Sequence, residues 1–197
     1  MQSTTQKAWI PISGTLTHRE SYGWIRWTAL SILFAGFTGL FAQLRLYLPF
    51  TPVPVTGQVF AVLLSGLLLG KKYGPLSQVF YLTLGMAGIP WFVIGPIGPT
   101  GGYIVGFIVA PFIIGELIER EHVRSTGSTK VDAASFTKVF SIALAGVAAI
   151  YVLGLIQFTI YTQTGLIRSI RYAVLPFIPF DILKAALAAA TVRTLMR

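Results

Sequence analysis

An aspartate and a lysine three residues apart carry the strongest chemical signal in this sequence. Asp181 and Lys184 stand in Pro-Phe-Ile-Pro-Phe-Asp-Ile-Leu-Lys, at the start of the last long apolar stretch. This spacing places both side chains on one face of a helix. Ionisable groups in an apolar stretch are costly and often functional, and this pair offers an acceptor for N–H donors and a cation for a carboxylate. A simpler interpretation stays open, in which Asp181 stabilises a helix N-terminus and Lys184 only pairs with it or extends to the membrane surface.

Two segments rich in proline or glycine carry further polar side chains. Thr56 and Gln58 follow Pro-Val-Pro-Val; Thr56 is suited to cap a helix, and Gln58 offers a donor and an acceptor in an apolar run. In Gly98–Tyr103, the glycines permit close backbone approach, and Thr100 is suited to cap a helix whose positive end faces an anion. Both segments are candidate parts of a binding site, although a role confined to a helix start or a tight turn stays open.

Aromatic side chains lie near the second of these segments. Trp91, Phe92 and Tyr103 are suited to pack on a ring system, because pockets for small ligands are mostly apolar with a few polar anchors. A belt of aromatic residues at a membrane surface explains them equally well.

The remaining residues argue against an enzyme, and we expect no cofactor or metal. The chain has no cysteine, and His18 and His122 both stand in polar segments on the predicted cytoplasmic side, where they make neither a metal site nor a catalytic triad. The run Gly66–Lys72 resembles a phosphate-binding loop, but its glycine spacing is one residue short and Lys72 replaces the Ser or Thr that binds magnesium. Asp181 has no second acid near it for a paired-carboxylate mechanism.

The composition is that of a membrane protein. Of the 197 residues, 54% are hydrophobic and 11% charged, and the mean hydropathy is +0.74, outside the range of soluble domains. The apolar runs are long and continuous, which predicts helices and not the alternating pattern of a barrel. The net charge of +9 is scattered between apolar runs, so a nucleic-acid partner is not expected.

We therefore predict an all-α polytopic membrane protein with six transmembrane helices and structured outer loops. Residues 1–23 form a polar tail, and residues 24–197 form a single transmembrane domain. The predicted crossings are Trp24–Leu48, Thr56–Leu69, Pro75–Ile94, Gly102–Leu117, Phe136–Tyr161 and Ala173–Leu195. The second is short for a bilayer, so we expect the segment before it, Pro49–Thr56, to enter the protein as non-helical backbone.

Charge predicts the orientation in the cell membrane. All but four of the 15 Lys and Arg residues fall on the side of the two termini, which predicts that both termini are cytoplasmic. The four exceptions are Arg45, Arg168, Arg171 and Lys184.

The loops on the opposite, outer side are predicted to form a pocket. They are Pro49–Thr56, Gly88–Gly102 and Thr164–Pro179, and their prolines make them stiff. Ordered irregular backbone in a membrane protein is tolerated where it is buried in protein or lines a cavity.

A stripe of small residues marks the first helix. Ser31, Ala35 and Gly39 recur every four residues and would allow close helix approach. We expect this stripe to meet a partner protein, although packing within the chain is the alternative.

Three of these regions resemble the signature regions of the BioY family. They are Pro52–Gly70, Gly98–Tyr103 and Pro176–Ala185, which occur in the right order in a chain with six predicted crossings. The resemblance implies the biotin-specific S component of an energy-coupling-factor (ECF) transporter in a prokaryotic plasma membrane, capturing biotin from outside. It further implies three partner subunits, a transmembrane coupling protein and two ABC-type ATPases.

The resemblance also implies roles for individual residues. Asp181 would accept a hydrogen bond from a ureido N–H, and Lys184 would meet the valerate carboxylate. The small stripe of the first helix lies where the family has its coupling surface. Residues 89–97 are shorter than in relatives and lack basic side chains, so Arg45, Arg168 or Arg171 are candidates for a second cation.

Other functions stay open on the sequence alone. The same fold could bind another vitamin or small carboxylate, or the chain could be a biotin carrier that works without partners. A membrane enzyme acting on lipid would need acids, bases or metal ligands that the sequence does not group together.

Overall fold

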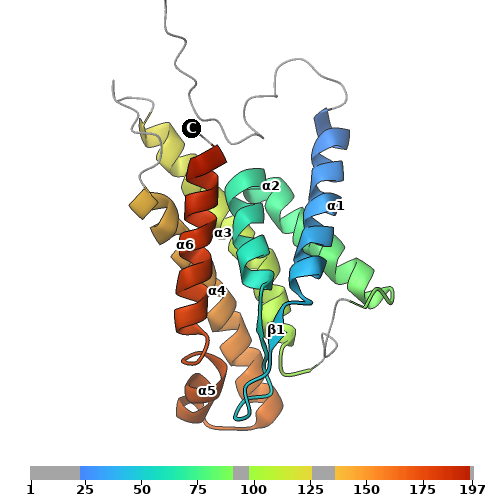
Figure 1. The fold of residues 1–197 in the computed structure, drawn as a ribbon, viewed down its shortest axis with the longest axis vertical. Helices are drawn as coiled ribbons and strands as arrows, with labels where there is room; N and C mark the ends of the chain where they lie inside the picture. The colour runs from blue at the N-terminus through green and yellow to red at the C-terminus, as the bar shows by residue number, and fades with distance from the viewer. Residues whose placement is uncertain (1–22, 91–97, 126–135, 196–197) are drawn as a thin grey trace, which may run out of the picture.

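The computed structural model describes residues 23–90, 98–125 and 136–195, and most of these are helical. Figure 1 shows the helices side by side as an elongated bundle, with one short antiparallel strand pair at one end. The elements are α1 (Gly23–Phe41), β1 (Arg45–Leu46), β2 (Val55–Thr56), α2 (Gln58–Met86), α3 (Gly101–Ser125), α4 (Phe136–Thr162), α5 (Leu166–Ala173) and α6 (Ile178–Leu195).

Helix α2 reverses its direction at Gly70. This residue has φ 73° and ψ −173°, a conformation open essentially to glycine. Gln58 and Tyr81 are 23 residues apart and would be separated by about 34 Å in a straight helix, yet the Gln58 Nε2 atom lies 2.6 Å from the Tyr81 hydroxyl. The element is therefore a helical hairpin with limbs 58–69 and 71–86, which correspond to the second and third predicted crossings (Figure 1).

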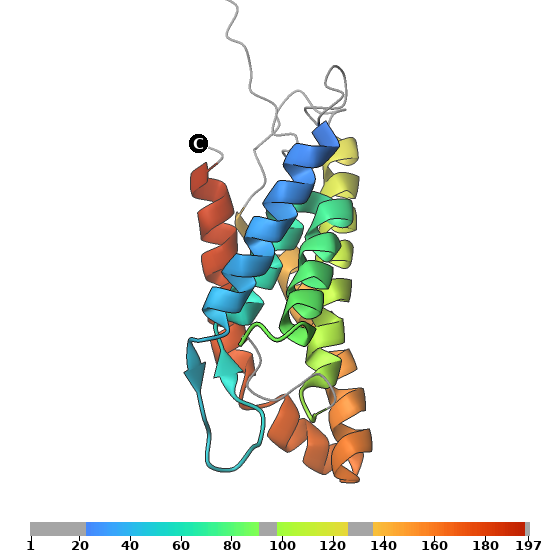
Figure 2. The same cartoon turned by 90° about the vertical axis from the view of Figure 1, so that its right-hand side faces the viewer.

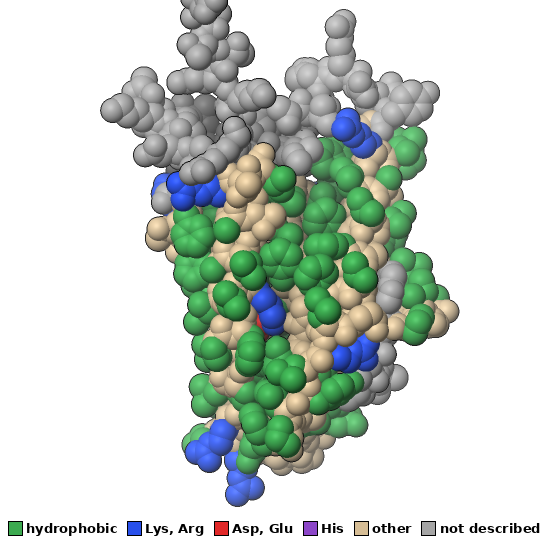
Figure 3. All heavy atoms as spheres, in the orientation of Figure 1, with side chains coloured by type: hydrophobic (Ala, Val, Ile, Leu, Met, Phe, Trp, Pro, Cys, Tyr) green, Lys and Arg blue, Asp and Glu red, His purple; other side chains and the backbone are tan. Residues whose placement is uncertain are grey.

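The prediction of an all-α membrane protein is confirmed. Within the described ranges, four helices are long and apolar enough to cross a membrane, and α5 with α6 makes a fifth candidate although the pair is bent by 52°. This count takes α2 as one helix. When its two limbs are counted separately and α5 with α6 is counted as one bent segment, the number is the predicted six. Large apolar side chains are exposed on these helices, among them Leu33, Ile160 and Leu183. Figure 3 shows hydrophobic side chains covering the middle of one face. Such a surface is suited to contact with the hydrocarbon core of a lipid bilayer.

The last crossing begins later than the sequence predicted. The prediction Ala173–Leu195 placed its start at Ala173, whereas α6 begins at Ile178 and Ala173 ends the separate helix α5. Pro176 lies between the two helices, where a continuous helix would lose a hydrogen bond and clash with the ring. Pro179 falls in the first turn of α6, where proline is tolerated.

Glycines bring α3 close to its neighbours. A Cβ atom at Gly106 would lie 2.8 Å from the Cα atom of Ile150 in α4, and one at Gly115 would collide with the backbone of Gly70 and Lys71. On the other side of the same interface, Gly154 of α4 leaves room for the Tyr103 ring. These contacts fix the height of α3 relative to α4 and to the reversal in α2.

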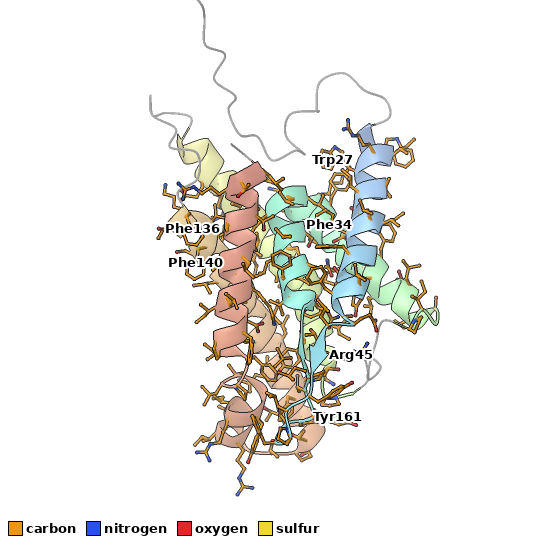
Figure 4. All side chains as sticks on the ribbon, viewed as in Figure 1. Trp27, Phe34, Arg45, Phe136, Phe140 and Tyr161 are labelled. Atoms are coloured by element: carbon orange, nitrogen blue, oxygen red, sulfur yellow. The ribbon has the colours of Figure 1, made fainter. Side chains whose placement is uncertain are left out.

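The small stripe of α1 is buried within the chain, in agreement with the alternative of packing inside the protein, and its role as a partner surface stays a prediction. Ser31 and Ala35 are fully buried and Gly39 is buried. The Ser31 hydroxyl donates a hydrogen bond to the Tyr73 carbonyl oxygen of α2 at 3.0 Å. Trp27 stacks on the Tyr73 ring at 5.7 Å, and it is labelled on α1 in Figure 4. In this conformation, the stripe packs α1 against α2.

We predict that Gly115→Ala destabilises the fold, since the added methyl group collides with backbone and not with a movable side chain. The expected loss is about 1 to 3 kcal/mol in the free energy of unfolding, as for other overpacked sites. Thermal unfolding in detergent measures it.

Gly36→Ala is the matched control, because a Cβ atom there meets nothing within 4 Å and alanine favours a helix interior. Equal melting temperatures for the two variants would contradict the tight α2–α3 packing.

Candidate substrate-binding site

One cavity gathers nearly all the polar residues that the sequence singled out. It lies between β2, α2, α3, α4 and α6, and it leaves ≈ 710 Å³ free of protein atoms, the open mouth included. Its lining residues are Val53, Pro54, Thr56, Gln58, Val59, Tyr81, Thr100, Tyr103, Ile104, Phe107, Ile150, Tyr151, Phe177, Asp181 and Lys184. Six of the seven predicted binding residues are among them, and the seventh, Trp91, lies outside the described residues.

Asp181 is the most enclosed charged group of the site. It is 3% exposed, and both of its carboxylate oxygens are occupied. The Lys184 ammonium group lies 2.6 Å from Oδ1, and the Tyr151 hydroxyl donates to Oδ2 at 2.7 Å. A buried charge of this kind is tolerated only when it is paired and hydrogen-bonded. The contact with Tyr151 also joins α6 to α4 beside the cavity.

The position of Asp181 at the start of α6 explains how its charged carboxylate is stabilised beside the cavity. The Asp181 amide donates to the Phe177 carbonyl oxygen at 2.9 Å, which closes the first turn of the helix. The carboxylate therefore sits near the positive end of the helix dipole, which stabilises its ionised form. Lys184 follows one turn later on the same face, so that both side chains reach the cavity. The pairing that the simpler interpretation proposed is present, but it occurs inside the cavity and not at the membrane surface.

A second polar group lies on the α2 side of the cavity. The Thr56 hydroxyl donates to the Gln58 Oε1 atom at 2.9 Å, and the Gln58 Nε2 atom donates to the Tyr81 hydroxyl at 2.6 Å. These bonds fix the orientation of the Gln58 amide and tie the two limbs of α2 together. The Gln58 amide keeps one further N–H and one lone pair that these two bonds do not use. It is therefore a neutral anchor, in contrast to the ionic pair on α6.

Apolar and aromatic side chains form the rest of the wall. Tyr103 donates a hydrogen bond from its hydroxyl to the Ala173 carbonyl oxygen, which ties α3 to the end of α5. Phe107 lies one turn further along α3, and Ile150 and Phe177 contribute from α4 and from the turn before α6. Thr100 lines the cavity directly before α3 begins. The site is an apolar chamber with few polar anchors, as is usual for small ligands.

The segment before α2 enters the protein as predicted. Strand β1 pairs with β2 in the register Arg45 with Thr56 and Leu46 with Val55. The connection between them places Val53 and Pro54 against the cavity, and Val53 is only 5% exposed. Figure 2 shows this hairpin and α5 at the same end of the bundle. We call this end the cavity end.

The arginines considered as a second cation stand outside the cavity. The Arg45 guanidinium bonds to the Ala42 carbonyl oxygen and to Gln43 Oε1, and Figure 4 labels it beside β1. Arg168 and Arg171 are exposed on α5. Among the described residues, Lys184 is therefore the one cation that lines the cavity.

The described residues offer hydrogen bonding and charge, and not metal chemistry, at this site. No group of three or more His, Cys, Asp or Glu side chains able to hold a metal ion occurs among them.

Sequence reasoning missed two tyrosines. Tyr81 and Tyr151 stand in the middle of long apolar segments, and both line the cavity. The available signal was the hydroxyl group itself, because a tyrosine buried in a membrane helix needs a polar partner. The identity of that partner depends on how the helices are rotated, which the sequence does not reveal.

The sequence matches a known transporter family over most of its length. Residues 11–197 match the BioY family. The chain is 37% identical to the biotin transporter BioY of Thermotoga maritima, over 72% of this chain and 80% of that protein. It is 38% identical to the probable biotin transporter BioY of Pyrococcus horikoshii, over 81% and 90%. A relative from Lactococcus lactis, also named biotin transporter BioY, is 28% identical over 85% and 90%.

The fold is also close to that of a solved structure. A crystal structure described as the S-component for biotin from an ECF-type ABC transporter aligns with a TM-score of 0.77 at 28% identity. The alignment covers 90% of this chain and 94% of that one.

We predict that breaking the ion pair destabilises the ligand-free protein more than removing it altogether. Lys184→Met leaves the buried Asp181 carboxylate with Tyr151 alone and should cost about 3 kcal/mol. The double variant Asp181→Asn/Lys184→Met removes the charge as well and should recover part of that loss.

Unfolding in detergent without ligand gives the free energy of unfolding of the wild type, Asp181→Asn, Lys184→Met and the double variant. These four proteins form a double-mutant cycle. Losses that simply add would mean that the two side chains do not interact in the folded protein.

Proposed function

We propose that this chain, which belongs to the BioY family, is the membrane-embedded S component that binds biotin for an importer. The observation that carries the proposal is the buried Asp181–Lys184 pair in the wall of an otherwise apolar cavity. The family is one of transporters and not of enzymes, and relatives that match most of this chain are named for biotin transport.

The chemistry of biotin is complementary to this cavity. Its sulfur-containing ring is apolar and suits the walls formed by Tyr103, Phe107 and Phe177. Its ureido group carries two N–H donors and one carbonyl acceptor, and its side chain ends in a carboxylate. The site offers one carboxylate acceptor in Asp181, one cation in Lys184 and a neutral amide in Gln58.

Binding requires the ion pair to open. Lys184 and Asp181 are 2.6 Å apart, whereas the ureido group and the carboxylate of biotin stand at opposite ends of the molecule. A ureido N–H would take the place of the ammonium group at Asp181 Oδ1, while Tyr151 keeps its bond to Oδ2. The flexible Lys184 stem would then carry the ammonium group to the carboxylate. The remaining contacts with biotin would come from Thr56, Gln58 and Thr100, and from Trp91 as the sequence predicts.

The energy for transport would come from partner proteins, a transmembrane coupling protein and two ABC-type ATPase subunits. The run Gly66–Lys72, which resembles a phosphate-binding loop, supports assigning ATP hydrolysis to the partner subunits. Lys71 follows the helix reversal at Gly70 and pairs with Glu116 and Glu119 at 2.9 Å each, so its charge is already balanced. A cytoplasmic position for both termini agrees with the excess of basic residues at that end, and the cavity would then face the outside.

We predict that the purified protein binds biotin and that Asp181→Asn and Lys184→Met each weaken the binding. The expected loss is about 1 to 3 kcal/mol per variant, or roughly 5- to 150-fold in Kd, because each change removes a charge-assisted contact. Calorimetric titration in detergent measures it.

The matched controls are Glu121→Gln and Lys138→Met, which remove an ion pair at the opposite end of the bundle. They should bind biotin as the unchanged protein does. A folded wild-type protein that shows no saturable binding would overturn biotin as the ligand.

We further predict that the cavity end faces the outside of the cell. The chain has no cysteine, so a single introduced one reports its own position. Ile167→Cys on α5, at a residue that is 78% exposed, should react with a membrane-impermeant maleimide in intact cells.

Arg120→Cys, near the end of α3 and also exposed, should react only after the cells are permeabilised. The reverse pattern of labelling would invert the proposed topology.

A further inference from the structure

The cavity end carries positive charge that nothing nearby balances. Arg168 and Arg171 are exposed on α5, and Arg45 lies in β1. Neither arginine of α5 forms a salt bridge with any residue in the described ranges. Figure 3 shows basic side chains projecting from the α5 end of the molecule.

The acids of the described residues do not offset this charge. Asp181 is buried and already paired with Lys184. The others belong to the far end of α3, where they pair with basic side chains; they are Glu116, Glu119 and Glu121. Among the described residues, the cavity end therefore carries a net positive charge, although positive charge in a membrane protein ordinarily collects on the cytoplasmic side.

Helix α5 is fixed beside the cavity. The hydroxyl of Tyr103, which lines the cavity, bonds to the Ala173 carbonyl oxygen at the end of α5. Arg171 is two residues earlier, about 3 Å along the helix axis. At the other end of α5, the Thr164 and Ser169 hydroxyls lie 2.9 Å apart, and Ser169 is fully buried. Arg168 is five residues before Ala173, about 7.5 Å along the axis, so the backbone of both arginines lies within a Debye length, about 8 Å at physiological salt, of the residue to which Tyr103 bonds.

We propose that Arg168 and Arg171 attract the anionic ligand to the mouth of the cavity and speed its capture, without holding it once it is bound. This rests on the proposed function, because the carboxylate of biotin is the charge on which they act. Exposed cations contribute little to a bound complex, and these two do not line the cavity. Their long-range field nevertheless raises the local concentration of an anion and hence its association rate.

The test compares biotin with biotinamide, its uncharged amide. The variant Arg168→Gln/Arg171→Gln is placed in discs of zwitterionic lipid, and stopped-flow fluorescence gives association and dissociation rate constants at low and high ionic strength. We expect the association rate constant for biotin to fall by about 3- to 10-fold at low salt and by less at high salt. The dissociation rate constant and both constants for biotinamide should not change.

The control is Arg120→Gln, which removes an exposed arginine at the opposite end and should leave every rate unchanged. An unchanged association rate, or an equal effect on biotinamide, would overturn the inference. So would an effect seen only in discs of anionic lipid, since the arginines would then bind lipid phosphate beside the exposed Leu166 and Ile167. Absence of biotin binding by the wild-type protein would overturn the proposed function as well, whereas normal binding with unchanged rates would overturn this inference alone.

Discussion

The site depends on one buried ion pair, between Asp181 and Lys184. A carboxylate in a membrane protein is costly unless its charge is balanced and its lone pairs are used. Asp181 meets both conditions through the Lys184 ammonium group, the Tyr151 hydroxyl and the start of α6. The protein's own groups thus stabilise both charges, which are those that an anionic ligand with N–H donors needs. In the proposed complex, the ligand would compete with Lys184 for Asp181, so affinity would reflect the difference between two sets of contacts.

The helices can be understood as the support for this pair. Tyr151 reaches Asp181 because α4 packs beside α6, and α4 is fixed against α3 by close glycine contacts such as that of Gly106 with Ile150. The reversal of α2 at Gly70 places Gln58 next to Tyr81 and so completes the neutral side of the cavity. Helix α5 closes the cavity end through the Tyr103 bond to Ala173. Each of these contacts joins residues that are more than 20 positions apart in the sequence.

The sequence predicted the membrane class and six of the fifteen described residues that line the cavity, for a physical reason. Polar residues in apolar helices must face protein or a cavity, so Gln58, Asp181 and Lys184 could be assigned to the interior without knowing the packing. The partner of Asp181 on α4 depends on helix rotation and could not be predicted. Helix α5 has only eight residues, too few to be recognised as a crossing, and its last residue, Ala173, was predicted as the start of the last crossing. The stripe from Ser31 to Gly39 allowed close packing with either a partner or the same chain, and the structure uses it within the chain.

The central claim is that biotin opens the Asp181–Lys184 pair and that Lys184 moves to the carboxylate. The most direct measurement is the affinity of the wild-type protein and of Lys184→Met for both biotin and biotinamide. The account predicts that the wild type prefers biotin by about 10-fold or more and that Lys184→Met loses most of this preference, since the charge that distinguishes the two ligands then has no partner. An undiminished preference in Lys184→Met would contradict the claim and would place the carboxylate of biotin elsewhere in the cavity.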